Sequence, residues 1–464
     1  MLFASATFLY YFLPAFLAVY YLTPRGARSF TLAIASYLFY GWWRPDFLIL
    51  MLTSTLVDFS AGAGIQRARE RGASGKPWLL LSLFTNLGLL AYFKYANFGI
   101  ESLNALLGAT GNTPIAWTQV VLPVGISFYT FQTLSYSVDV YRGTSKPVQR
   151  FRDFLCYVAM FPQLVAGPIV RYNTVAEQLA GRTHTWSKFY QGVLAFQSGF
   201  AKKVLIADVL GGVADSAFGA NALTTHDAWF GALAYTFQIY FDFSGYSDMA
   251  IGLGLMIGFR LPINFDSPYR SRSITEFWRR WHISLSSFLR DYLYLPLGGN
   301  RRGPLRTYIN LATVMLLGGL WHGAAWTFLA WGAYQGFWLI AERLAGKRNL
   351  FGGLPRVLQV ALSFLIVICG WVLFRASDLD SAGNVLASMF GAAPGNAQPL
   401  LALLRPIHVL TFAVAAIVVW GLPTTQKLVA RPPLRWAGAL QVLFPLALAH
   451  MHYEQNVPFL YFQF

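Results

Sequence analysis

The chain alternates between long apolar runs and short polar connections. Runs of nearly uncharged sequence cover residues 2–22, 78–93, 228–240 and 307–341. Most of them, with their flanks, approach or exceed the roughly 20 residues that a helix needs to cross the hydrocarbon core. A membrane β-barrel would show short alternating segments instead, and helices are the other structure that satisfies every backbone amide in lipid. The pattern therefore predicts an all-α polytopic membrane protein.

Hydropathy predicts about eleven to thirteen transmembrane helices. They are expected at residues 3–22, 30–43, 47–64, 78–95, 119–138, 154–170, 190–211, 228–257, 307–341 (one or two helices), 357–375, 408–422 and 436–450. The two longer connections, 96–118 and 376–407, are too small for separate domains. Since no internal repeat or low-complexity tail is evident, we expect one membrane domain over residues 1–464.

Composition and charge favour a membrane protein over a nucleic-acid-binding protein. Hydrophobic residues make up 56% of the chain and charged residues 12%, against roughly 45–50% and about 25% in soluble proteins. The net charge of +16 is concentrated in residues 67–76, 142–152 and 260–306, which the positive-inside rule assigns to the cytoplasm. The excess charge therefore indicates topology. The start of the chain is then expected outside, as a retained helix without signal-peptide features.

Residues 271–303 resemble neither a membrane span nor an ordinary loop. Ser273 and Glu276 have the spacing of a capping box that starts a helix. The apolar residues after them, including Trp281, recur at helical spacing through residue 292, which predicts one amphipathic helix at an interface or in a re-entrant position. His282 lies on its apolar face. The sequence allows two interpretations of His282: a hydrogen-bonded core residue, or a residue that lines a reaction tunnel.

Residues 307–341 contain no charged side chain. One helix of this length would be roughly 50 Å long, beyond the roughly 30 Å hydrocarbon core, so we expect a break at Gly318-Gly319. His322 follows at membrane depth, and a titratable group there is usually functional, although a structural hydrogen bond is the alternative. A neutral imidazole, with an unperturbed pKa near 6.5, can accept a proton from an attacking hydroxyl.

Other polar features have both structural and functional interpretations. Asp242 and Asp248 are intramembrane carboxylates, for which we expect an ion pair or hydrogen bond with an arginine of residues 260–306; a proton relay is the alternative. Residues 161–172 (FPQLVAGPIVRY) combine a Gly167-Pro168 helix break with Arg171, as at a helix end or the lining of a cavity. Two cysteines in apolar sequence offer no metal-ligand spacing, so no metal site is expected.

Several long motifs, taken in order, resemble the membrane-bound O-acyltransferase family and specifically its bacterial branch. They are FYTFQTLSYSVDVYRG from Phe128, FPQLVAGPIVRY from Phe161, YFDFSGYSDMAIGLG from Tyr240, FWRRWHISLSSFLRDYLYLPLGGNRRG from Phe277, WHGAAWTFLAWG from Trp321, and the closing VPFLYFQF. The resemblance implies a ring of transmembrane helices around a thinned centre with re-entrant or interfacial helices, in which a catalytic histidine is approached from both faces. The family's tryptophan-histidine motif maps onto Trp321 and His322, and its arginine-tryptophan-histidine motif maps onto Arg280, Trp281 and His282.

The resemblance also implies the chemistry and the partners. Members of this branch move an acyl group from a cytoplasmic thioester to a hydroxyl reached from the other side of the bacterial inner membrane. Acetyl-CoA is the expected donor, with no permanently bound cofactor. Its phosphates would meet residues whose alternative role is to set topology or contact anionic lipids: Arg270, Arg272, Arg279, Arg280, Asn300, Arg301 and Arg302.

The expected acceptor is alginate, reached through a separate periplasmic acetyltransferase because no periplasmic domain is evident. Acetylation of cellulose or peptidoglycan, and D-alanylation, are alternatives within the same branch. Two alternatives come from other classes. A proton-coupled transporter would use Asp242 and Asp248 but should show inverted halves, which are not evident. A non-catalytic scaffold of a polysaccharide-export complex would not depend on either histidine.

Overall fold

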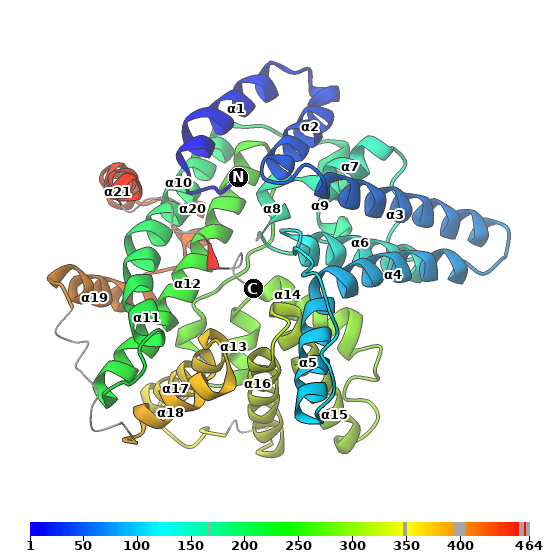
Figure 1. The fold of residues 1–464 in the computed structure, drawn as a ribbon. Helices are drawn as coiled ribbons and strands as arrows, with labels where there is room; N and C mark the ends of the chain where they lie inside the picture. The colour runs from blue at the N-terminus through cyan, green and yellow to red at the C-terminus, as the bar shows by residue number, and fades with distance from the viewer. Residues whose placement is uncertain (166, 347–349, 393–403, 454–458, 461–464) are drawn as a thin grey trace. The chain divides into compact units, whose positions relative to one another are not determined.

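Helices account for all the regular structure that can be described (Figure 1). The computed structural model describes residues 1–165, 167–346, 350–392, 404–453 and 459–460, and no strand occurs in these ranges. The all-α class predicted from the continuous apolar runs is therefore confirmed. The chain divides into two compact units: unit 1 comprises Met1–Phe189 with Leu253–Pro262, and unit 2 comprises Tyr190–Gly252 with Ile263–Phe464.

The helices fall into the two units as follows. Unit 1 contains η1 (Thr7–Phe12), α1 (Leu13–Leu22), η2 (Arg25–Ala27), α2 (Arg28–Gly41), α3 (Phe47–Glu70), α4 (Lys76–Leu90), η3 (Ala91–Tyr95), α5 (Ala96–Ala109), α6 (Ile126–Arg142), α7 (Phe151–Ala159), α8 (Phe161–Leu164) and α9 (Tyr172–Ala180). Unit 2 contains η4 (Lys203–Asp208), α11 (Val209–Phe218), η5 (Pro268–Arg270), α13 (Ile274–Arg280), α14 (Ile283–Leu289), η6 (Arg290–Tyr294), α15 (Pro304–His322), α16 (Trp326–Leu344), α17 (Arg356–Arg375), α18 (Leu379–Met389), α19 (Pro406–Gly421), α20 (Thr425–Ala430) and α21 (Leu434–Tyr453). The chain passes between the units within α10 (Trp186–Lys202), within α12 (Thr225–Met256), and again between Pro262 and Ile263.

Within the described ranges, three helical stretches are long and apolar enough to cross a membrane. They are Phe47–Glu70, Lys76–Ala109 and Arg356–Arg375, and Thr7–Leu22 and Pro406–Gly421 are shorter apolar helices. All five coincide with predicted spans. By length and composition they are fewer than the predicted eleven to thirteen, because other predicted spans are interrupted or carry more polar residues.

Two predicted boundaries are wrong for identifiable reasons. Residues 96–109, expected in a connection, form α5 and continue the helix that starts at Lys76. Residues 154–170, expected as one span, end as a helix at Ala159 and resume only for the four residues of α8. Pro162 and Gly167-Pro168 interrupt this helix, and Ala166 lies outside the described residues. Tyr157 donates to the carbonyl of Val170 at 3.0 Å, which satisfies a backbone acceptor of the extended part.

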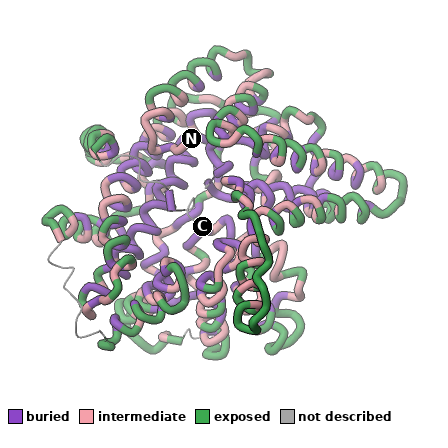
Figure 2. The backbone as a smooth tube through the Cα atoms, viewed as in Figure 1, coloured by how far each residue is buried: buried purple, intermediate pink, exposed green. Residues whose placement is uncertain are grey.

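The long helices of unit 1 bury their polar residues against one another. Helices α3 and α4 lie side by side as a hairpin (Figure 1), and the far end of the hairpin is exposed while α6 is largely buried (Figure 2). Asp58 of α3 is fully buried. It accepts from Asn86 at 2.9 and 3.0 Å and from Ser82 at 2.5 Å, both in α4. A carboxylate in an apolar helix is thus held by hydrogen bonds from its neighbour, as burial requires.

In unit 2, the break in the 307–341 run lies later than predicted. Helix α15 continues through Gly318-Gly319 and ends at His322, and α16 begins at Trp326. The glycine pair instead allows close packing: a Cβ at Gly319 would collide with the carbonyl oxygen of Phe328, and one at Gly332 with that of Met315. The helix breaks at Gly323, where a Cβ would collide with the ring of Phe328. The small residues therefore bring α15 and α16 together.

Replacing Gly319 with Ala should destabilise the protein, because the added Cβ meets a backbone atom that cannot move without shifting α16. Overpacking of this kind costs about 1–3 kcal/mol, so Gly319→Ala should unfold several degrees lower in a thermal assay in detergent. The matched control is Gly88→Ala in α4, where no atom lies within 4 Å of the new Cβ and alanine favours the helix. Equal unfolding temperatures for the two variants would contradict the packing argument.

Candidate active site

His282 lies at a break between two short helices rather than inside one helix. The predicted cap is confirmed, since Ser273 Oγ accepts from the backbone N–H of Glu276 at 3.1 Å. Helix α13 nevertheless ends at Arg280, and α14 starts at Ile283. Between them His282 has φ +42°, in the left-handed region. The prediction of one continuous amphipathic helix is therefore wrong, because His282 adopts a backbone conformation that is unusual for a non-glycine residue and costs energy.

Asn264 stabilises this break. Its backbone carbonyl accepts from the N–H of Ile283 at 3.0 Å. Its side-chain Oδ1 accepts from the N–H of Ser284 at 3.2 Å and from the Ser284 hydroxyl at 2.9 Å. One residue, distant in sequence, thus supplies acceptors for amides at the start of α14 that have no partner within the helix.

Asn264 also sets the protonation of His282. The Nδ2 group of Asn264 donates to Ser247 at 3.3 Å, which leaves Oδ1 as the atom that faces His282 Nδ1 at 3.2 Å. A carbonyl oxygen accepts only, so Nδ1 carries a proton and Nε2 carries the lone pair of the neutral ring. His282 is fully buried, and burial lowers its pKa to about 3. His282 does not lie in a membrane-spanning helix, because α13 and α14 on either side of it have only seven residues each.

His322 is the last residue of α15 and lies close to His282. The centroids of the two imidazole rings are 6.3 Å apart. His322 is 5% exposed, and its ring packs edge-on against Trp331 at 5.3 Å and Phe374 at 5.2 Å. Trp321 lies 5.1 Å from His322 and 6.0 Å from His282. The structure therefore brings together both histidines and the tryptophan that the sequence marked as site residues.

Aromatic rings enclose the histidine pair. Trp281 is 2% exposed and lies 4.8 Å from Trp371, which stacks on Trp331 at 5.9 Å. On another side, Phe243 of α12 contacts His282 edge-on at 4.7 Å. An aromatic surrounding has a low local dielectric, so each polar interaction of the histidines is stronger there than in water. Trp281 thus serves as part of the aromatic wall.

Glu342 is a positioning residue that the sequence analysis did not single out. Its carboxylate, on α16, accepts from the backbone N–H groups of Ile274 at 2.5 Å and Thr275 at 2.8 Å. These are the first amides of α13, where a negative charge also meets the positive end of the helix dipole. Glu342 is 5% exposed. The feature of the sequence that could have identified Glu342 is its position directly after the uncharged run 307–341.

The predicted phosphate-binding residues divide into engaged and exposed groups. Arg280 pairs with Glu276 at 2.8 Å, and Arg270 donates to the carbonyls of Val419 and Leu422 at 2.6 Å, where it caps the end of α19. These two arginines are committed to contacts within the chain, and Arg272 lies 3.4 Å from Glu276. The residues of the set that remain exposed are Arg272, Arg279, Asn300, Arg301 and Arg302, and of these Arg272 pairs with Glu276.

The two carboxylates of α12 form ion pairs, but with lysines instead of the expected arginines. Lys202 pairs with Asp248 at 2.7 Å, and Lys203 pairs with Asp242 at 3.3 Å. The arginine prediction fails because the neighbouring helix segment α10–η4 supplies the cations.

The described part of the closing segment, residues 459–460, also reaches α12. The N–H of Leu460 donates to Asp242 at 2.9 Å, and Phe459 packs on Tyr246 at 4.6 Å and on Phe243 at 6.1 Å. Since Phe243 contacts His282, the segment supports the aromatic shell from outside. The other residues of the VPFLYFQF motif lie outside the described residues. In the described ranges, no group of three or more His, Cys, Asp and Glu residues could hold a metal ion.

Comparisons with known proteins are consistent along the whole chain. Residues 149–349 match the membrane-bound O-acyltransferase family. The chain is 46% identical to the probable alginate O-acetylase AlgI of Azotobacter vinelandii, with 100% of both chains covered. It is 37% identical to the peptidoglycan O-acetyltransferase of Helicobacter pylori, over 84% of this chain and 80% of that protein. It is 28% identical to the teichoic acid D-alanyltransferase of Streptococcus thermophilus, over 54% of this chain and 68% of that protein.

Replacing Asn264 with Ala should destabilise the break at His282. The variant leaves Ser284 N–H and His282 Nδ1–H without their acceptor, and each buried unsatisfied group costs about 1–3 kcal/mol. Thermal unfolding should occur at a clearly lower temperature, and limited proteolysis should cut faster within residues 274–289. The control is Asn173→Ala, which removes one exposed 3.4 Å hydrogen bond. The assignment fails if Asn264→Ala behaves like Asn173→Ala in both assays.

Proposed function

Because the chain belongs to the membrane-bound O-acyltransferase family, we propose that it transfers an acetyl group from a cytoplasmic thioester to a hydroxyl reached from the opposite face of the membrane, with His322 as the reacting imidazole. The protein is a polytopic helical membrane protein and an O-acyltransferase. The observation that carries the assignment of the site is the buried pair of histidines, with ring centroids 6.3 Å apart.

His322 is the better candidate for the reacting group. His282 is fully buried, and its Nδ1 is committed to Asn264. His322, in contrast, stands where α15 ends, and the next residues grade from half-buried Ala324 and Ala325 to exposed Trp326. We propose that a substrate reaches His322 from this side, where burial decreases along the chain. His282 more naturally supports and positions the site, because its backbone and ring are both fixed.

Two balanced versions of the reaction fit an imidazole at this position. In the first, His322 takes the proton of the acceptor hydroxyl while the hydroxyl oxygen attacks the thioester carbonyl. The carbon–sulfur bond then breaks, and the imidazolium returns the proton to the leaving thiolate. In the second, an imidazole nitrogen attacks the thioester, releases the thiol, and carries the acetyl group until the hydroxyl takes it. The aromatic shell excludes water in both cases, so hydrolysis of the donor is limited.

Acetyl-CoA is the proposed donor, and no permanently bound cofactor is required. The exposed arginines of the 271–303 segment, Arg279, Arg301 and Arg302, are not committed to the internal pairs that hold Arg270 and Arg280. Guanidinium groups bind phosphate oxygens through paired N–H donors. Together with Asn300 they are the residues proposed to meet the donor's phosphates on the cytoplasmic side.

Alginate is the proposed final acceptor, reached through a periplasmic acetyltransferase partner at the bacterial inner membrane. The support is the 46% identity, over the whole chain, to a protein described as a probable alginate O-acetylase. Peptidoglycan acetylation and teichoic-acid D-alanylation have weaker support, since identity falls to 37% and 28%. Neither the transporter nor the scaffold is favoured: the carboxylates that a proton relay would use are held in ion pairs with lysines.

The His322→Ala variant should lose acetyl transfer while the protein stays folded. Removal of a general base lowers rates by roughly 10²–10⁴-fold, and loss of an acyl carrier would lower them at least as much. The measurement is transfer of label from radiolabelled acetyl-CoA to a surrogate hydroxyl by purified protein. The control is His226→Ala, at an exposed position near the start of α12, which should retain full activity. A folded His322→Ala variant with full transfer refutes the assignment.

The same assay without an acceptor separates the two versions of the reaction. If His322 carries the acetyl group, the wild-type protein should retain label that hydroxylamine removes, and His322→Ala should not. If His322 is a general base, neither protein should retain label in the absence of acceptor. The wild-type protein should still transfer label once acceptor is added.

Expression in an alginate-producing host that lacks its own homologue should restore ester-linked acetate on secreted alginate. Wild type and His226→Ala should restore it, and His322→Ala should not, by hydroxylamine assay of the purified polymer. If the wild-type protein transfers label from acetyl-CoA but the host's alginate stays unmodified, alginate is ruled out as the final acceptor. The transferase assignment then remains intact.

A further inference from the structure

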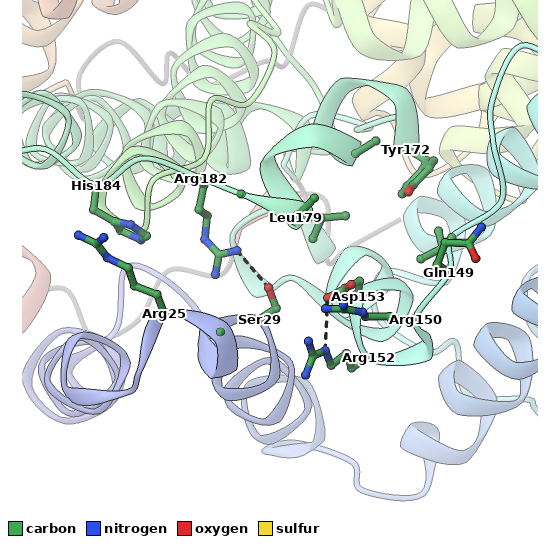
Figure 3. Close-up of a pocket in the computed structure, with 15 residues that line it drawn as sticks. Arg25, Ser29, Gln149, Arg150, Arg152, Asp153, Tyr172, Leu179, Arg182 and His184 are labelled. Atoms are coloured by element: carbon green, nitrogen blue, oxygen red, sulfur yellow. Dashed lines mark hydrogen bonds and ion pairs between the residues drawn. The ribbon is translucent and has the colours of Figure 1, made fainter.

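Unit 1 contains a cationic cavity that the acyl-transfer proposal does not use. Its volume is about 610 Å³, and Figure 3 shows the residues that line it. Four arginines line it, contributed by η2, by the start of α7, and by the connection between α9 and α10: Arg25, Arg150, Arg152 and Arg182. His184, Ser29 and Tyr172 are also in the lining, and Asp153 is the carboxylate in it.

The positive charge of this cavity is poorly neutralised by the protein. Asp153 lies 3.9 Å from Arg152, at the limit of an ion pair. In the described part of the chain, Arg25, Arg150 and Arg182 form no ion pair with a carboxylate. Like charges gathered in one cavity repel one another unless an anion lies between them. The cavity thus has the electrostatic character of an anion site.

Arg182 provides the most specific evidence. Its Nε donates to Tyr20 at 2.9 Å and its Nη1 to Ser29 at 3.1 Å, so the plane of the guanidinium is fixed. Its Nη2 is buried and has no hydrogen-bond partner. A buried donor without an acceptor is costly, and a bound water or ion is one of its explanations. An oxygen-rich anion would satisfy it.

Tyr20 also determines the state of His184. Its hydroxyl donates to the carbonyl of Ile257 at 2.9 Å, so the hydroxyl oxygen accepts from His184 Nε2 at 2.9 Å. Nδ1 then carries the lone pair of the neutral ring. Burial, together with the neighbouring Arg28 and Arg182, lowers the pKa of His184 to about 4. The positive charge in the cavity therefore comes from the arginines, and His184 Nδ1 can accept a hydrogen bond from a ligand hydroxyl.

The topology places the cavity where phosphate is available. The positive-inside rule assigns residues 142–152 to the cytoplasm. Because successive predicted spans cross the membrane in opposite directions, residues 23–29 are assigned to the same side. Arg25 and Arg150, from these two connections, line one cavity. Anionic lipid headgroups and soluble phosphate esters are both present on that side. Arginines that only set topology would have no reason to line one cavity together.

We propose that the cavity lined by Arg25, Arg150, Arg152 and Arg182 binds the phosphate group of an anionic ligand, either a lipid headgroup or a soluble phosphate ester. Arg182 Nη2 and the guanidinium groups of Arg25 and Arg150 donate to the phosphate oxygens, and His184 Nδ1 accepts from a hydroxyl of the ligand. The site shares no residue with the histidine pair, and the proposal does not rest on the acyl-transfer function.

The test uses the full-length protein in nanodiscs. Inorganic pyrophosphate, titrated calorimetrically into protein in pure phosphatidylcholine nanodiscs, reports a soluble source. Retention of phosphatidylglycerol after delipidation, measured by native mass spectrometry, reports a lipid source. The wild-type protein should bind at least one probe. Arg150→Gln/Arg182→Gln should weaken that binding by roughly tenfold or more, because charge-assisted hydrogen bonds are lost.

The matched control is Arg67→Gln/Arg71→Gln, which removes two exposed arginines of a cytoplasmic connection that do not line the cavity. It should bind like wild type. If the Arg182 variant does not fold, Arg25→Gln/Arg150→Gln removes two exposed arginines without touching Tyr20 or Ser29. The proposal is overturned if neither probe binds, if the cavity variants bind like wild type, or if the control loses binding equally.

Discussion

The architecture of the candidate active site depends on the hydrogen bonds that Asn264 makes to the break between α13 and α14. A helix that stops inside a hydrophobic protein exposes amide groups, and in a membrane no water replaces the lost bonds. Asn264 supplies acceptors to Ile283, Ser284 and His282. Because these groups are satisfied, His282 can keep φ +42° and a fixed ring. The break in turn lets the chain deliver His282 toward His322 at the end of α15.

A second principle is that every buried charge described in these helices has a specific partner. Glu342 accepts from the first amides of α13, and Lys202 and Lys203 pair with Asp248 and Asp242. Such pairs add little net stability, because desolvation offsets most of the attraction, but removal of one member leaves a costly isolated charge. They therefore act mainly to fix which helices meet. In unit 2 they hold α10–η4 against α12, and α16 against α13, so the elements that carry the histidines have one arrangement.

The cavity of unit 1 departs from this principle. Its arginines outnumber the carboxylates beside them, and Arg182 keeps a buried donor without an acceptor. Because the chain supplies too few carboxylates to neutralise these arginines, the cavity suits an anionic ligand from outside the chain. The break at His282 is satisfied by Asn264 within the chain, whereas the cationic cavity is proposed to be satisfied by a bound anion.

The sequence alone determined the class of the protein and the identity of the central histidines. Long apolar runs require helices in a membrane, the Ser273 cap is encoded by neighbours three residues apart, and a histidine in an uncharged run is conspicuous without a structure. These are local properties of the chain. Tertiary structure alone decided the rest: the breaks at residues 281–282 and 323–325, the Asn264 and Glu342 contacts, the lysine partners of Asp242 and Asp248, and the convergence of Arg25, Arg150 and Arg182. Each depends on a contact between segments far apart in sequence, and local pattern carries no information about which distant residue supplies the missing hydrogen bond or charge.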